Sequence, residues 1–176
     1  MSTYWGKRSY AQQSTDVDGL SERGLVYLMA QKFSITSSGS VAFSLNPNGT
    51  NLEIHAYTLS NTGETCYAEL IESASATSYG TAIPGRNLNR NYTDTHTAVL
   101  KSASAISGGT VIANELFGSE KASGGEDSGR VHALNPSRQY VMNFTNLGNQ
   151  ATTCHINLVW SENEPDHYNL IRNVTD

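Results

Sequence analysis

The chain has 176 residues and a formal net charge of −5 at pH 7, and only 15% of its residues are charged. Its lysines and arginines are scattered, which excludes the clustered basic face that nucleic-acid binding needs. No apolar run approaches the roughly 20 residues that cross a bilayer, so we expect neither nucleic acid nor membrane as a partner.

The first 24 residues are polar and aperiodic but contain an aromatic trio, Tyr4, Trp5 and Tyr10. An exposed tail has little use for three aromatic rings, whereas an arm that packs on a neighbour has a clear use for them. We therefore predict an extended N-terminal arm over residues 1–24. This segment has no apolar core of the kind a secretory signal requires, which favours synthesis and assembly in a cytoplasm.

From residue 25 to residue 161 the chain alternates apolar and polar residues, as half-buried strands do. Turn-forming residues return about every ten positions, which is typical of a sandwich or barrel. No stretch keeps a helical period, although Glu115–Phe117 has the composition for a single turn. We predict eight to ten strands in an all-β, antiparallel, two-sheet sandwich of jelly-roll type, followed by a polar tail over 162–176. The clearest strands are expected within 25–29, 41–45, 52–57, 66–70, 131–133, 140–144 and 154–160.

An internal repeat lies in the middle of this domain. The stretch Leu70–Ile83 returns 29 positions later as Val99–Ile112, and both copies read S-A-S-A-x-S-x-G-T-x-I over their last eleven residues. Each copy crosses a small-residue stretch between apolar ends, so we predict a duplicated hairpin. A longer connection follows each copy, at Pro84–Thr97 and Ala113–Arg130, and connections of that length are mobile or used for contact.

Two cysteines, Cys66 and Cys154, stand in strand-like contexts. A reducing compartment favours two buried thiols that behave as small apolar groups, and an oxidising one permits a single disulfide. The sequence leaves both states open.

Metal ligands are sparse. His96 and Asp94 form the only pair with plausible ligand spacing, but a zinc site needs three or four ligands. Glu126–Asp127 lies in a Gly/Ser-rich loop without the spaced oxygen ligands of an EF-hand. We therefore expect two solvated loop pairs, no metal and no cofactor.

Catalytic motifs are also missing from the sequence. Glu53, Glu69 and Glu72 lie on predicted strands, but nothing singles out two of them as the paired carboxylates of a glycosidase. No nucleophile elbow or phosphate-binding loop is present. We therefore expect no catalytic residues and a protein that is not an enzyme.

The loop Arg86–Tyr92 is the most distinctive chemical stretch. If it is extended, Arg86, Leu88 and Arg90 face one side and the intervening asparagines face the other. Guanidinium forks and amides bind carboxylates and backbone groups with directional hydrogen bonds, although a solvated polar loop explains the same residues equally well. The predicted partner interface comprises Tyr4, Trp5, Tyr10, Arg86, Asn87, Asn89, Arg90 and Tyr92.

These elements in this order resemble a known class. A strand leads to a small-residue segment ending G-T-x-I, then to an R-N-x-N-R-N loop and a second copy of the repeat. Later the chain reads L-N-P-S-R-Q-Y-V-M-N-F-T-N-L and closes with I-N-L-V-W. The pattern, over Leu70–Asn91, Val99–Ile112 and Leu134–Trp160, is similar to decoration or cement proteins on the capsid exterior of tailed bacteriophages.

The resemblance implies a non-enzymatic β-sandwich, often trimeric, clamped across joints between major capsid subunits on the outside of the virion. The arm is not part of the matching pattern. A second hypothesis is a tail- or fibre-associated module that binds host surface glycan, with Tyr57, Tyr67 and Tyr79 as outward stacking platforms for sugar rings.

Overall fold

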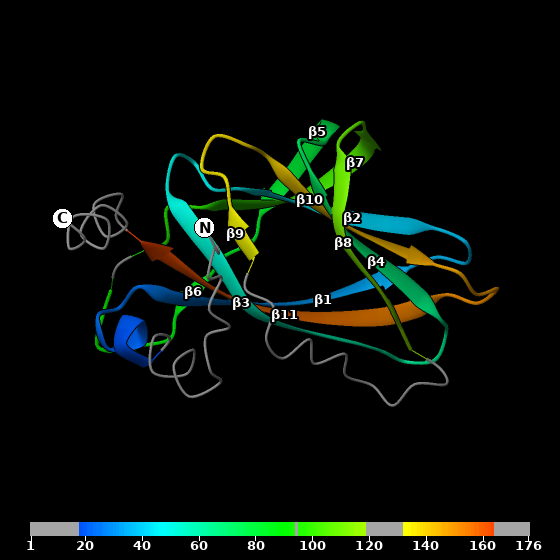
Figure 1. Cartoon of the computed structure of the whole chain (residues 1–176). Helices are drawn as coiled ribbons and strands as arrows, with labels where there is room; N and C mark the ends of the chain where they lie inside the picture. The colour runs from blue at the N-terminus through cyan, green and yellow to red at the C-terminus, as the bar shows by residue number, and fades with distance from the viewer. Residues whose placement is uncertain (1–17, 94, 119–131, 164–176) are drawn as a thin grey trace, which may run out of the picture.

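A computed structural model of the chain describes residues 18–93, 95–118 and 132–163 (Figure 1). Several positions discussed above therefore lie outside the described residues, and they are Tyr4, Trp5, Tyr10, Asp94, Glu126, Asp127 and most of the tail over 162–176. No helix among the described residues is long and apolar enough to cross a membrane.

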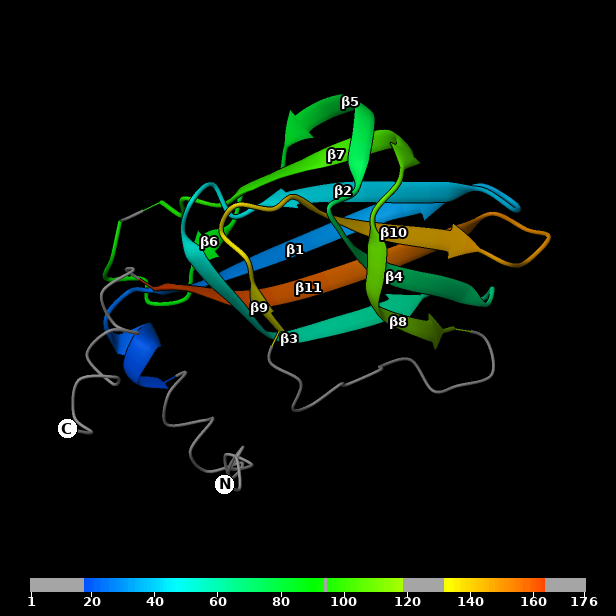
Figure 2. The same cartoon turned by 45° about the horizontal axis from the view of Figure 1, so that its top comes forward.

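The described chain folds into two antiparallel sheets that pack face to face (Figure 2). The first sheet contains, in spatial order, β6 (Arg86–Asn87), β1 (Val26–Ile35), β11 (Thr152–Asn163), β3 (Asn51–Asn61) and β9 (His132–Leu134). The second contains β5 (Ser75–Ala82), β7 (Val99–Ser107), β2 (Ser40–Asn46), β10 (Tyr140–Asn146), β4 (Cys66–Glu72) and β8 (Thr110–Phe117). The all-β, two-sheet antiparallel sandwich is thus confirmed.

Eight of these strands have the order of a jelly roll. Strands β1, β11, β3 and β9 are neighbours in one sheet, and β2, β10, β4 and β8 are neighbours in the other, so the chain changes sheet at nearly every step. Strands β5 and β7 extend the second sheet beyond β2, and β6 extends the first beyond β1. The described residues hold eleven strands, slightly more than predicted. The two-residue strand β6 lies in a stretch that was expected to be a loop.

The core lies between the inner faces of the sheets, where the period-two pattern places the large side chains. Phe33, Phe43 and Phe144 form one aromatic cluster, with ring centroids 5.0 to 5.9 Å apart. Tyr27 stacks on Trp160 at 5.8 Å near the other end of the sandwich. Trp160 is fully buried, so the closing strand β11 anchors the end of the domain that carries β6.

The repeat does not form two hairpins, which corrects that prediction. Strand β4 pairs with β8 and strand β5 pairs with β7, so the two copies are the two legs of one long antiparallel ribbon. One register runs from the Ile71–Val111 pair to the Tyr79–Ala103 pair. When each residue of the pair Ser75–Ser107 is replaced by its equivalent in the other copy, the result is Ser104 and Ser78, and these two residues are also paired. The repeat therefore gives the ribbon a local pseudo-twofold symmetry.

The ribbon bends across the outer face of the second sheet, which explains its small residues. Its far end joins the sheet beside β2, while its near end lies beside β10. Below the bend, outward side chains of β2, β4 and β10 form a second apolar cluster with the ribbon. Its members are Ala42, Ile71, Ala74, Val141, Ala103 and Ile106. Small residues at the bend let the two layers approach closely.

Three predicted boundaries also change. Residues 18–22 are helical rather than extended, so the predicted arm is not extended throughout. Ala113–Phe117 continues β8 as a strand, with no helical turn, because Phe117 packs into the core. Strand β11 runs to Asn163, and the buried Glu162 belongs to the domain rather than to the polar tail.

Candidate functional site

The predicted interface loop, Arg86–Tyr92, contacts the base of the N-terminal arm. Asn87 pairs with β1 and donates from Nδ2 to the carbonyl of Gly24 at 2.7 Å. Asn89 Nδ2 donates to the carbonyl of Glu22 at 3.1 Å. The ring of Tyr92 lies so close to Gly24 that a Cβ there would come within 2.5 Å of it. These three side chains, which we name the arm anchor, hold residues 18–25 against the sandwich.

The asparagines also shape their own loop. Asn87 Oδ1 accepts from the Asn89 N–H at 2.9 Å, and Asn89 Oδ1 accepts from the Asn91 N–H at 3.1 Å. Such side-chain turns fix a loop without regular structure. The amides of Asn87 and Asn89 therefore bind groups of this chain, and their role as partner-binding groups stays a prediction.

Arg86, Leu88 and Arg90 are exposed residues of the same loop, and we call these three the arginine ridge. Exposure alternates as predicted over residues 86–90, where these three are exposed while Asn87 and Asn89 are half-buried. The alternation ends at Asn91, which is exposed, because the chain turns between Asn89 and Tyr92. Leu88 is 40% exposed and stands between the two arginines. The structure thus separates the predicted interface into the arm anchor and the arginine ridge.

We call the loop Arg86–Tyr92, together with the arm residues 18–25 that contact it, the platform. A buried carboxylate stabilises this platform. Glu162 on β11 accepts hydrogen bonds from the backbone N–H of Thr97 at 2.6 Å and of Ala98 at 2.9 Å, and from Trp160 Nε1 at 3.1 Å. The Glu162 N–H donates to the carbonyl of Leu25 at 3.0 Å. One residue therefore ties together the end of the loop, the core tryptophan and the base of the arm.

His96 lies in the same cluster and is not a solvated loop residue, contrary to the prediction. Its Nδ1–H donates to the carbonyl of Ala98 at 2.6 Å, and its Nε2 accepts from the Gly85 N–H at 2.9 Å. Its ring packs edge-on against Tyr27 and Trp160. Since both nitrogens are engaged, the ring is held as one neutral tautomer and offers no lone pair to a metal.

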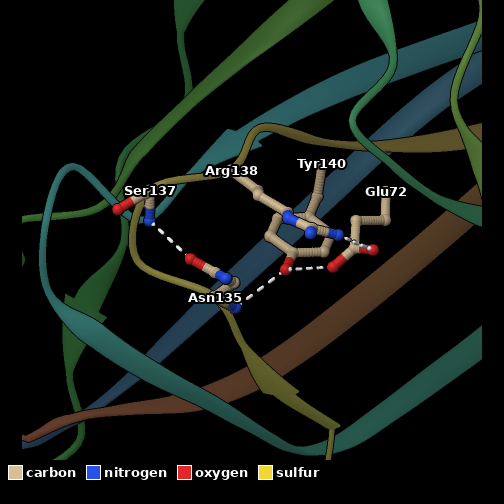
Figure 3. A network of polar contacts seen from close by, with 5 residues as sticks. All are labelled: Glu72, Asn135, Ser137, Arg138 and Tyr140. Carbon is tan, nitrogen blue, oxygen red and sulfur yellow. Dashed lines mark hydrogen bonds and ion pairs between the residues drawn. The ribbon is translucent and has the colours of Figure 1, made fainter.

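The glutamates of β4 do not form a catalytic pair. Glu72 accepts from Arg138 Nη1 at 2.5 Å and from the Tyr140 hydroxyl at 2.9 Å, and the Asn135 N–H donates to the same hydroxyl oxygen at 2.8 Å (Figure 3). Glu69 lies on the other face of the strand and accepts from Asn143 at 3.2 Å. The Glu72 network therefore fastens the β9–β10 connection to the end of β4.

Replacing Tyr140 by phenylalanine should lower the free energy of unfolding by about 1.5 kcal/mol, because Asn135 and Glu72 lose a buried partner. Burial is the main cause that raises the pKa of the Tyr140 hydroxyl above its ordinary 10.0. That contribution to stability is complete below the unfolded pKa and is lost as pH rises through the folded pKa. Urea unfolding at pH 8 and above pH 10 should show a steeper alkaline loss in the wild type than in Tyr140→Phe, and equal slopes would contradict this.

The three tyrosines proposed as sugar platforms are not brought together. The Tyr57 hydroxyl donates to Glu115 at 3.0 Å, across the open edge between β3 and β8. Tyr67 is in β4 and Tyr79 in β5, and strands β7, β2 and β10 separate these two in the sheet. Beside Tyr57 lies an apolar cavity of about 50 Å³ between the sheets. It is far smaller than the roughly 300 Å³ at which ligand pockets begin.

The remaining polar candidates are dispersed. Within the residues that the structure describes, no group of three or more His, Cys, Asp or Glu side chains could hold a metal ion. Sequence reasoning missed Glu162, whose only sequence signal is a charge directly after an apolar strand, and it missed the cavity, whose lining comes from both sheets.

Comparisons with known proteins add little. No protein-family model matches the chain, and no curated protein sequence matches it. The crystal structure of a mitogen derived from Yersinia pseudotuberculosis is similar to this chain, with 10% identity and a TM-score of 0.43, over 74% of this chain and 83% of the mitogen. A likeness of this size carries no argument about function.

Proposed function

We propose that this chain is a non-enzymatic virion structural protein that binds the outside of a phage capsid lattice and stabilises it, as a decoration or cement protein. The observation that carries the proposal is the platform at β6. There, one loop fastens the base of the N-terminal arm through Asn87 and Asn89 and leaves Arg86, Leu88 and Arg90 exposed.

The platform suits a lattice binder for a physical reason. Association costs several kcal/mol of translational and rotational freedom, and a small module offsets this cost through several linked contacts. The 17 residues before the anchored segment span at most about 55 Å when extended, which is enough to reach a neighbouring subunit with Tyr4, Trp5 and Tyr10. The ridge supplies the second contact, with two guanidinium groups for acidic or carbonyl partners.

The sequence resemblance supports the same proposal, since the matching stretches include the ribbon, the platform loop and the closing strand. On this proposal the partner is the major capsid protein and the chain is a homo-oligomer, with a trimer favoured. Light scattering on the purified full-length chain tests the trimer directly.

The first experiment is to quantify the chain against the major capsid protein in purified particles by mass spectrometry. A copy number comparable to that of the capsid protein is expected for a lattice-wide cement. A far smaller copy number would place the chain at a vertex or in the tail and favour glycan binding instead. Absence from particles would overturn the proposal.

A truncation tests the role of the arm. Removing residues 1–17 keeps the anchored segment 18–25, so the sandwich should fold as before while binding to undecorated capsids falls at least tenfold. The double variant Arg86→Ala/Arg90→Ala tests the ridge, and the exposed Lys32→Ala on β1 serves as its matched control. Undiminished binding of the truncated chain would remove the arm from the mechanism.

A further inference from the structure

Two cysteine side chains from opposite sheets meet inside the sandwich. Cys66 is the first residue of β4 in the second sheet, and Cys154 lies in β11 of the first. Both are fully buried, and their sulfur atoms are 3.9 Å apart. The two residues are 88 positions apart in sequence, so only the packing of the sheets brings them together.

We propose that Cys66 and Cys154 are a site of covalent modification, at which oxidation by a small-molecule disulfide such as oxidised glutathione closes an inter-sheet disulfide. The inference does not depend on the proposed function. It selects one of the two states that the sequence left open.

The geometry needs little rearrangement. A disulfide bond is about 2.05 Å long, so the sulfur atoms must approach each other by roughly 2 Å. No side chain has to leave the space between them, because they are already in contact. Asn61 Nδ2 donates to the Cys66 sulfur at 3.2 Å and fixes the position of that side chain.

The chemistry is two thiol–disulfide exchanges. One thiolate attacks oxidised glutathione, forms a mixed disulfide and releases one glutathione thiolate. The second cysteine then attacks the protein sulfur of that mixed disulfide and releases the second glutathione. The two thiols of the chain lose two protons and two electrons, and one glutathione disulfide becomes two glutathione thiols.

Burial of the two thiols determines when the disulfide can form. Removal from water raises the pKa of the Cys154 thiol to about 12, with a further contribution from the neighbouring Cys66. Very little Cys154 thiolate therefore exists in the folded protein near neutral pH, and both sulfur atoms are buried, whereas exchange requires a reactive thiolate together with access of the oxidant. Closure should accordingly be slow in the native state and fast while the chain folds.

The cross-link would enclose residues 66–154, which contain strands β4 to β10. Closing a loop of this length restricts the unfolded chain strongly, and for a domain of this size the expected rise in melting temperature is about 10 °C. The dithiol form would remain folded, because both side chains pack as small apolar groups.

The test refolds the full-length chain from urea in oxidised and reduced glutathione, with a parallel sample in excess reductant. Intact mass after alkylation should show loss of two hydrogens and no alkylated cysteine in the first sample, and two alkylated cysteines in the second. Tryptic peptides should link Cys66 to Cys154, and melting of the linked form should be higher by about 10 °C. Native protein kept in the same buffer should oxidise at least tenfold more slowly.

The single variant Cys154→Ala is the matched control, since it keeps Cys66 but cannot close the bond. Its melting temperature should be the same after both treatments. Two alkylated thiols in the wild type after oxidative refolding, a stable mixed disulfide with glutathione, or a linked form that melts below the dithiol would each overturn the proposal.

Discussion

Replacing Glu162 by alanine should lower the free energy of unfolding by about 4 kcal/mol. The change leaves three N–H donors without their acceptor, namely the backbone groups of Thr97 and Ala98 and the indole of Trp160. Two of these donors, the Ala98 amide and the Trp160 indole, belong to buried residues, whereas Thr97 is exposed. Each unsatisfied buried donor costs about 1 to 3 kcal/mol, and Glu162 is only 6% exposed, so little water can reach the two buried donors. Urea unfolding followed by circular dichroism gives the measurement.

The effect should also be local to the platform. Amide hydrogen exchange at Thr97 and Ala98 should accelerate in Glu162→Ala, whereas the amides of β10 should keep their protection relative to global unfolding. Glu22→Ala is the matched control, because its carboxylate is exposed and only its backbone carbonyl contacts Asn89. A midpoint for Glu162→Ala equal to that of Glu22→Ala would show that the carboxylate does not support the platform.

The sandwich could be predicted because its signal is local. Alternation at period two places Phe43, Met142 and Trp160 on inner faces without any knowledge of the partner strands. The turn at residues 146–150 has a similar local origin, since Asn146 accepts from the Gly148 N–H and donates to the Gln150 carbonyl. Such contacts within four residues can be inferred from composition.

The strand pairing of the two repeat copies could not be predicted, because the observed pairing joins residues that are distant in sequence. A hairpin within each copy and a ribbon between the copies use the same residues and the same small-residue stretch. The ribbon prevails because Ile71 and Val141 leave an apolar patch on the outer face of the sheet, which the bend covers. That patch exists only after β4 and β10 have paired.

The role of the platform loop was predicted only in part, because some of its contacts are with residues that are distant in sequence. Alternation separated Arg86 and Arg90 from the asparagines correctly. Asn87 and Asn89 are ordinary loop residues in sequence, and only the return of residues 22–24 to the loop reveals their acceptors. Glu162 was missed because its partners Thr97 and Ala98 are far from it in the chain. His96 was expected to be solvated because Trp160, on which its ring packs, is equally distant in sequence.

Gly109→Ala should lower the free energy of unfolding by about 3 kcal/mol, because at the bend Gly109 lies directly against residues 71–74 in the other leg of the ribbon. Gly109 has φ +85°, a conformation that costs an alanine about 1 kcal/mol. An added Cβ would also lie 2.7 Å from the Glu72 carbonyl oxygen and 2.9 Å from the Ala74 nitrogen. These are backbone atoms, so the ribbon itself would have to move, at a further cost of about 2 kcal/mol.

Gly108 provides a control with the same strain but without the contact. It has φ +68°, and a Cβ built on it meets nothing within 4 Å. Gly108→Ala should therefore cost only about 1 kcal/mol, and the difference between the two variants isolates the close approach of the two legs of the ribbon at the bend. Equal losses in urea unfolding would mean that the two legs of the ribbon are not in close contact at Gly109, and the packing explanation of this glycine would fail. Gly80, the equivalent of Gly109 in the first copy, differs in its contact, because a Cβ there would meet the side-chain hydroxyl of Ser102 rather than backbone atoms.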